Sequence, residues 1–192
     1  MQLATASIET PLGVYALLAN DRGLVRAQPS ELTTPARGAG GAGTAAERML
    51  ESARTAFASY FAGSCAALSS LPLDPQGSEF QRLVWRALRK IPLGATASYG
   101  EVALQIGRPG AARAVGDANR RNPIAIAIPC HRVIGGDGRL VGYAGGLERK
   151  RWLLAHEATC AGYPAHAASS NGPEEQLPIA LARRRISAAA SI

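Results

Sequence analysis

Residues 98–120, SYGEVALQIGRPGAARAVGDANR, predict two short helices that are joined by a tight turn. Ser98 and Glu101 have the spacing of a capping box, so the first helix is expected to begin at Ser98. Residues 108–110, RPG, have the composition of a turn, and the second helix is expected over residues 111–120. Two short helices around a three-residue turn that contains Gly are typical of a helix-turn-helix.

The segments on either side of this motif predict a domain that is mainly helical. Residues 79–90 predict a helix with an apolar stripe, and residues 147–157 predict a last helix. Between them, residues 124–128 form an apolar run that predicts a buried strand, and residues 135–138, GGDG, predict a turn. We therefore assign residues 78–158 to one mainly helical domain.

A different pattern precedes residue 78 and predicts a small α/β domain. Short strands separated by turn signals are expected over residues 3–9, 12–19 and 23–28. Their spacing favours an antiparallel sheet. We assign residues 1–77, which end in a connecting segment that contains two prolines, to this first domain.

Two segments have the composition of irregular structure. Residues 28–43, rich in Pro, Gly, Ala and Thr, predict a mobile loop, after which Thr44 is expected to cap a helix that runs to about Phe61. Residues 159–192, rich in Ala, Ser and Pro, predict a flexible tail.

The composition of the chain excludes several classes of protein. Of its 192 residues 47% are hydrophobic, so global disorder is not expected. No apolar run approaches the roughly 18 residues of a membrane helix, and the N-terminus lacks the basic start of a signal peptide. Cys65, Cys130 and Cys160 make neither a disulfide framework nor a CxxC metal motif. We expect a cytoplasmic protein with no metal site.

The positive charge of the chain is concentrated in the middle segment. Residues 78–157 hold eleven Arg and two Lys against six acidic residues. The net charge of this segment is therefore +7, which equals the net charge of the whole chain. An excess of this kind indicates an anionic partner, and nucleic acid is the commonest one. A solvated basic surface, or the Arg bias of a GC-rich genome, stays open as the alternative.

Residues 128–133, IPCHRV, contain the candidate nucleophile Cys130. A nucleophilic cysteine needs exposure, a base and surroundings that favour the thiolate, and His131 and Arg132 could supply the base and the positive potential. Adjacent residues on a strand point to opposite faces, so a contact between Cys130 and His131 requires a turn or a bridging water. On these residues alone, a buried structural cysteine remains the alternative.

Several motifs together resemble the O6-alkylguanine-DNA alkyltransferases. Over residues 78–157 the resemblance rests on many sequence motifs. Over residues 1–77 it rests only on the expected arrangement of the elements. The form of residues 142–146, GYAGG, is similar to the bacterial housekeeping branch of that family. The motifs are residues 80–90 with Trp85, Ser98-Tyr99, 111–116 (AARAVG), Asn122-Pro123, 128–133 (IPCHRV), 142–147 (GYAGGL) and 152–157 (WLLAHE).

This resemblance implies a fold and a reaction. The first domain would be RNase H-like, and the second would combine the helix-turn-helix with a Pro-Cys-His-Arg active-site loop. The chain would transfer a methyl or small alkyl group irreversibly from O6-alkylguanine in duplex DNA to Cys130, once per molecule and after base flipping. O4-alkylthymine stays open as a further substrate. Neither a cofactor nor an obligate protein partner is implied.

The resemblance also implies roles for five residues of the site. Cys130 would accept the alkyl group, and His131 would take the thiol proton through a water. Glu157 would bond to His131 and stabilise its charged form. Tyr99 would donate its hydroxyl to the guanine, and Asn122 would brace the backbone before Cys130. The ordinary alternatives are a solvated Glu157, a Tyr99 that only packs in the core and an Asn122 that only caps a helix.

The second helix of the helix-turn-helix would enter the DNA minor groove in this family. Arg113 would fill the gap that the flipped base leaves, while Arg120 and Arg121 are candidates for phosphate contacts. Ala144 stands where other members have Ser, so the contact to the guanine oxygen would rest on backbone N–H groups. A helix packed closely on a neighbour through its alanines is the alternative. The remaining expected DNA contacts are Ala111, Ala112, Ala114, Gly116 and Tyr99, and the substrate pocket is Pro129, Tyr143, Ala144 and Gly145.

Three other functions are alternatives to this one. A non-enzymatic protein that binds alkylated DNA and recruits other repair factors would lack the acceptor cysteine, whereas Cys130 is present. A transcription regulator that senses alkylation would need a further DNA-binding or Cys-rich module. A Cys-His hydrolase would be favoured by an acidic or neutral surface around Cys130, and the segment is basic.

Overall fold

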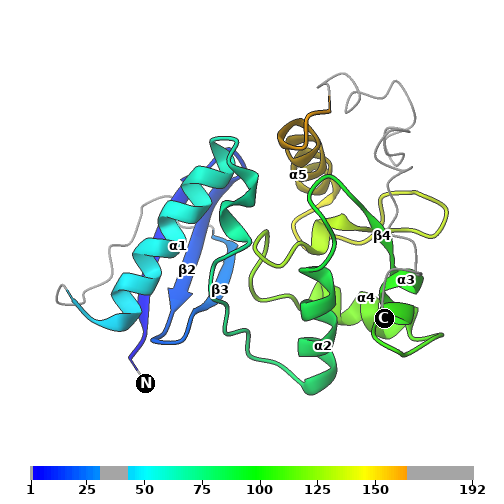
Figure 1. The fold of residues 1–192 in the computed structure, drawn as a ribbon, viewed down its shortest axis with the longest axis horizontal. Helices are drawn as coiled ribbons and strands as arrows, with labels where there is room; N and C mark the ends of the chain where they lie inside the picture. The colour runs from blue at the N-terminus through cyan, green and yellow to red at the C-terminus, as the bar shows by residue number, and fades with distance from the viewer. Residues whose placement is uncertain (1, 31–42, 164–192) are drawn as a thin grey trace. The chain divides into compact units, whose positions relative to one another are not determined.

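The computed structural model describes residues 2–30 and 43–163 (Figure 1). These residues form two compact units: the described residues up to Gly77 together with Pro123–Ala127, and residues 78–122 together with residues 128–163. Most of the predicted loop (31–42) and most of the predicted tail (164–192) lie outside the described residues. The tail was expected to begin at residue 159, but the last helix continues to Cys160.

The first unit is a three-stranded antiparallel sheet with one long helix. Strands β1 (Ala4–Thr10), β2 (Gly13–Ala19) and β3 (Leu24–Pro29) are neighbours in that order. Helix α1 (Ala45–Phe61) runs along the sheet (Figure 1), and the short helix η1 (Cys65–Leu68) follows it. The core side chains of α1 recur every three or four residues, which is the period of a helix with one buried face: Ala46, Leu50, Ala53, Phe57 and Tyr60.

Residues 123–127 belong to this first unit although they follow the helices of the second. The Ala27 N–H donates to the Pro123 carbonyl at 2.9 Å, and the Ala125 N–H donates to the Ala27 carbonyl at 2.8 Å. The predicted buried strand over 124–128 is wrong, because the pairing stops at an isolated bridge between Ala27 and Ile124. The Ala127 N–H instead bonds to the Ala125 carbonyl at 2.9 Å across Ile126, whose φ is 73°. This γ-turn bends the chain out of the sheet.

The second unit contains the remaining helices. They are α2 (Glu79–Leu88), α3 (Tyr99–Gln105), α4 (Ala112–Arg120) and α5 (Leu147–Cys160), with a short helix η2 (Cys130–Arg132). Helices α3 and α4 form the predicted helix-turn-helix, and α2 packs on both. The buried indole of Trp85 on α2 donates to the Ala118 carbonyl of α4 at 2.9 Å, which fixes α4 against α2.

Three helix starts are confirmed in atomic detail. Thr44, Ser78 and Ser98 are the N-caps of α1, α2 and α3, and each forms a capping box with the residue three positions on. The reciprocal bonds satisfy backbone N–H groups that have no partner inside the helix, so each box fixes where its helix begins.

A two-residue parallel ladder positions the ends of two segments that carry candidate site residues. Strands β4 (Ala97–Ser98) and β5 (Val133–Ile134) pair with Ala97 opposite Val133. Tyr99 comes directly after β4, and η2 with Cys130 comes directly before β5. Within the described ranges, no helix is long and apolar enough to cross a membrane.

Candidate active site

Cys130 is the first residue of η2 and is only 5% exposed. Its N–H donates to the Ile128 carbonyl at 2.8 Å across Pro129, which is itself buried. Burial raises the pKa of the Cys130 thiol; the Asn122 side chain, the charge of Lys150 and nearby backbone N–H groups oppose this shift without cancelling it. The thiol is therefore protonated at neutral pH, and it needs a base before it can act as a nucleophile.

His131, Arg132 and Glu157 form a buried cluster beside the thiol loop. His131 is 0% exposed and Glu157 1% exposed, and His131 Nε2 lies 2.9 Å from Glu157 Oε1. Arg132 donates to both carboxylate oxygens, with Nε–Oε2 at 2.7 Å and Nη2–Oε1 at 2.8 Å, and also to the Ile91 carbonyl at 2.6 Å. The predicted pairing of His131 with Glu157 is present in the structure, whereas the clamp from Arg132 was not predicted.

The charge state of the cluster follows from these contacts. Burial alone would raise the pKa of the Glu157 carboxyl, but His131 and Arg132 outweigh it and hold the pKa at about 2. Burial lowers the pKa of His131, and Glu157 only partly restores it. We conclude that at neutral pH Glu157 is ionised, its charge is balanced by Arg132, and His131 is neutral.

The hydrogen bond to Glu157 also assigns the tautomer of His131. A carboxylate only accepts hydrogen bonds, so the proton of neutral His131 lies on Nε2. His131 Nδ1 then carries a lone pair; it is buried and has no hydrogen-bond partner among the described residues. This nitrogen is the atom of the site that can accept a proton.

Two asparagines hold the backbone on either side of Cys130. Asn122 Nδ2 donates to the Ile128 carbonyl at 2.8 Å, which is the brace expected of this residue. Asn119 Nδ2, on α4, donates to the Cys130 carbonyl at 3.3 Å. Asn119 was not predicted as a site residue, although an asparagine on the buried side of a helix is a signal that could have indicated it.

Tyr99 lies between α4 and the loop that was predicted as the substrate pocket. Its hydroxyl is within donating distance of the Val141 and Gly142 carbonyls, at 3.3 and 3.4 Å. A side chain at Gly116 would begin 3.7 Å from the Tyr99 ring. Burial and the neighbouring Cys130 raise the pKa of Tyr99, so the hydroxyl keeps its proton and remains a donor at neutral pH.

The other predicted pocket residues lie on a tight turn before α5. The Gly146 N–H donates to the Tyr143 carbonyl at 3.0 Å, and Ala144 in this turn is exposed. Gly145 has no room for a side chain, because a Cβ there would come within 2.9 Å of the Tyr143 ring. The glycine therefore lets the Tyr143 ring fold over the turn.

Lys150 is a charged residue of the site that was not predicted. It is 0% exposed, and its Nζ donates to the carbonyls of Val133 at 2.6 Å and Val141 at 2.7 Å. Leu154 and Glu157, four and seven residues on, are also buried. This spacing places Lys150 on the inner face of α5, a signal that its basic neighbours Arg149 and Arg151 obscured.

The predicted DNA-facing residues of α4 divide into two groups. Arg113 and Ala114 are exposed, whereas Ala111, Ala112 and Gly116 are partly buried. Arg120 and Arg121 are exposed but each lies 2.9 Å from a carboxylate oxygen of Asp117. These two arginines therefore share an acidic partner on the same helix.

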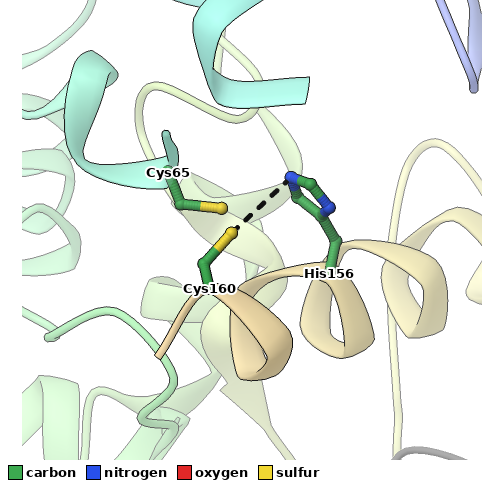
Figure 2. Close-up of side chains that lie close together, drawn as sticks. All are labelled: Cys65, His156 and Cys160. Carbon is green, nitrogen blue, oxygen red and sulfur yellow. Dashed lines mark hydrogen bonds between the residues drawn. The ribbon is translucent and has the colours of Figure 1, made fainter. Parts of the chain in front are cut away.

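A second histidine lies on α5 outside this cluster. His156 Nε2 is 3.9 Å from Cys160 Sγ, one turn further along the helix, as Figure 2 shows. The ring of Trp152 stacks on His156 with centroids 4.9 Å apart. Neither His156 nor Cys160 contributes to the His131–Glu157 pair.

Comparison with known proteins identifies both halves of the chain. Residues 79–159 match the DNA-binding domain of 6-O-methylguanine DNA methyltransferase, so the helix-turn-helix unit is a DNA-binding domain. Residues 3–75 match the ribonuclease-like domain of the same family. The chain therefore belongs to the 6-O-methylguanine DNA methyltransferase family. The expected family and the two-domain fold class are confirmed.

Individual relatives agree with this assignment. A methylated-DNA–protein-cysteine methyltransferase of Mycolicibacterium paratuberculosis is 49% identical over 151 residues, which cover 79% of this chain and 90% of the relative. One from Salmonella typhimurium is 60% identical over 100 residues, which cover 52% of this chain and 58% of the relative. The structure of Mycobacterium tuberculosis OGT in complex with DNA matches with a TM-score of 0.68 and 42% identity, over 84% of this chain and 96% of that one.

Proposed function

We propose that the protein repairs alkylated DNA by direct reversal. A methyl or small alkyl group moves from O6 of a guanine in duplex DNA to Cys130 Sγ. The observation that carries this proposal is the buried thiol beside a neutral histidine whose free nitrogen can accept a proton. A thioether is a poor leaving group, so each molecule reacts once.

In the proposed reaction, His131 removes the thiol proton. Its Nδ1 accepts the proton through one water, and ionised Glu157 stabilises the imidazolium that forms. Sγ then forms a bond to the alkyl carbon while the bond from that carbon to O6 breaks. The electron pair stays with the guanine, which finally receives the proton that the thiol lost. Tyr99, a hydroxyl donor at neutral pH, offsets the negative charge that develops on the leaving base.

The substrate has to leave the base stack before it can reach a buried thiol. We propose that α4 enters the minor groove, that exposed Arg113 takes the place of the flipped base, and that flanking arginines contact phosphates. Because the thiol must stay reduced to act, a reducing cytoplasm is the proposed compartment.

Intact-protein mass spectrometry tests this function. One equivalent of duplex DNA with O6-methylguanine should add one methyl, about 14 Da, to Cys130 and then end the activity. The Cys130→Ser variant should bind the same duplex and gain no mass. Multiple turnovers, or a methyl on Cys65 or Cys160, would contradict the proposal. Binding without any change in mass would favour the alternative, a non-enzymatic protein that recruits other repair factors.

A further inference from the structure

The side-chain amide of Asn119 has one end bonded and the other end unpaired. Asn119 on α4 is 4% exposed, and its Nδ2 donates to the Cys130 carbonyl at 3.3 Å. A carbonyl only accepts hydrogen bonds, so this contact requires the NH2 group to face Cys130. The other end, Oδ1, is buried and has no hydrogen-bond partner among the described residues. A buried acceptor without a donor is costly, so this oxygen calls for a functional explanation.

This amide lies among residues of the proposed substrate site. Gly116 is one turn earlier on α4, and a side chain there would begin 3.7 Å from the Tyr99 ring. The Tyr99 hydroxyl interacts with the Asn119 side chain, and this contact opposes the rise in the pKa of Tyr99. The amide therefore contacts both Tyr99 and the backbone of the reactive cysteine, and Oδ1 belongs to the same planar group.

The chemistry of the proposed substrate offers one donor for this acceptor. Alkylation of O6 removes the proton from N1 of guanine, so the 2-amino group is the only hydrogen-bond donor that the alkylated base keeps. Thymine that is alkylated on O4 has lost its N3 proton in the same way and carries no amino group, so it has no donor. A buried acceptor in the site can therefore distinguish the two alkylated bases.

We propose that Asn119 Oδ1 accepts a hydrogen bond from the 2-amino group of the flipped O6-alkylguanine and makes the site selective for guanine over thymine. This role rests on the proposed alkyl transfer. The bond to the Cys130 carbonyl holds the amide in the orientation that leaves Oδ1 available. A base without the amino group leaves Oδ1 buried and unpaired, and sites that bond a substrate group discriminate against analogues that lack it.

The test compares two duplexes that differ only in the amino group of the methylated base. Single-turnover transfer to Cys130 is measured with O6-methylguanine and with O6-methylhypoxanthine, which has a hydrogen in place of the 2-amino group. The ratio of the two rates should fall about tenfold from the wild type to Asn119→Leu, the effect of one hydrogen bond. The intrinsic reactivities of the two bases cancel in this comparison. The rate with O4-methylthymine, relative to O6-methylguanine, should rise in the same variant.

The same ratio separates recognition from structural damage. Asn122→Leu is the matched control, because Asn122 is the other amide that bonds a carbonyl next to the thiol. It should slow both substrates and keep the wild-type ratio. An Asn119→Leu variant that also slows both substrates equally would overturn the proposal and leave Asn119 a brace of the loop that carries Cys130.

A binding measurement keeps the proposal testable without transfer. If the wild type transfers no methyl group from either duplex, the proposed function fails, and the affinities of Cys130→Ser for the two duplexes decide the role of Asn119. The preference of Cys130→Ser for O6-methylguanine should then fall about tenfold when Asn119→Leu is added. A preference that this second substitution leaves unchanged would overturn the proposal.

Discussion

Arg132 and Glu157 are joined by two parallel hydrogen bonds of 2.7 and 2.8 Å in the interior of the DNA-binding unit. Burial lowers the pKa of His131 and makes it a neutral base, and Glu157 only partly restores that pKa while the charge of Arg132 opposes the restoration. Arginine presents its donors in a fixed fork that matches a carboxylate, so this position is also geometrically defined.

The stability of the protein should depend on pH through Glu157. Its folded pKa of about 2 lies below the ordinary value of 4.5, so the ionised carboxylate stabilises the folded state at neutral pH. The contribution is complete above about pH 4.5 and is lost as the pH falls toward 2. Urea unfolding of wild type and Glu157→Gln should show a difference that shrinks over this interval. Glu148→Gln, on an 84% exposed side chain of the same helix, is the control. A difference that stays constant down to pH 2 would contradict the assignment.

His131 and Glu157 should act as one unit on the thiol. Removing either should slow methyl transfer at pH 7 by about a hundredfold or more, since a positioned base contributes on the order of 10² to 10⁴. The double variant should lose far less than the product of the two single losses, because the second residue has no role without the first. Single-turnover rates for the four proteins decide this. His156→Gln on α5 is the matched control, and multiplicative losses would show that the two residues act separately.

Arg113 should matter for duplex DNA and not for a free base. If it occupies the vacated base position, Arg113→Ala leaves the cost of flipping, a few kcal/mol, without compensation. Transfer from duplex DNA should then slow strongly, while transfer from free O6-methylguanine should barely change. Arg120→Ala should weaken binding and lower the salt slope by about one unit without this contrast. Equal losses on both substrates would place Arg113 in the pocket instead.

Asp117 should restrain DNA binding. Its carboxylate lies 2.9 Å from both Arg120 and Arg121, which are the candidates for phosphate contacts. Asp117→Asn removes the competing anion, so affinity for undamaged duplex should rise and the dependence of log K on log salt should steepen by up to about one unit per freed arginine. Asp137→Asn, at another exposed acid paired with an arginine, should have little effect. An unchanged slope would mean that these arginines do not reach phosphates.

Local signals predicted much of the fold because they act over a few residues. Ser98 and Glu101 fix the start of α3 by two short-range bonds, and both residues are visible in the sequence. The prediction of a strand over the apolar run at 124–128 was wrong because the structure there depends on a contact that is distant in the sequence. Its burial was predicted, but the γ-turn at Ile126 depends on pairing with Ala27, nearly a hundred residues earlier in the chain.

The site shows the same division. Cys130 and His131 lie in one motif, and Glu157 was added from the resemblance to a family. The clamp of Arg132 on Glu157 and the contacts of Lys150 depend on how α5 packs against the loop that carries Cys130. No short stretch of the sequence determines this packing. A lysine between two arginines has the pattern of a solvated helix face, and only its spacing from Leu154 points inward.

The bonds between Ala27 and the segment 123–127 constrain how far the first unit can fold while the chain is being synthesised. A nascent chain that has emerged only as far as Gly77 contains β1, β2, β3 and α1, and residues 72–74 can already pair with Leu24 of β3, but Ala27 still lacks its backbone partner. The ribosome must add all of α2, α3 and α4 before Ala27 is paired. The first part of the chain to be made is thus among the last to be completed, and it closes only when the residues that lead to the reactive cysteine have been translated.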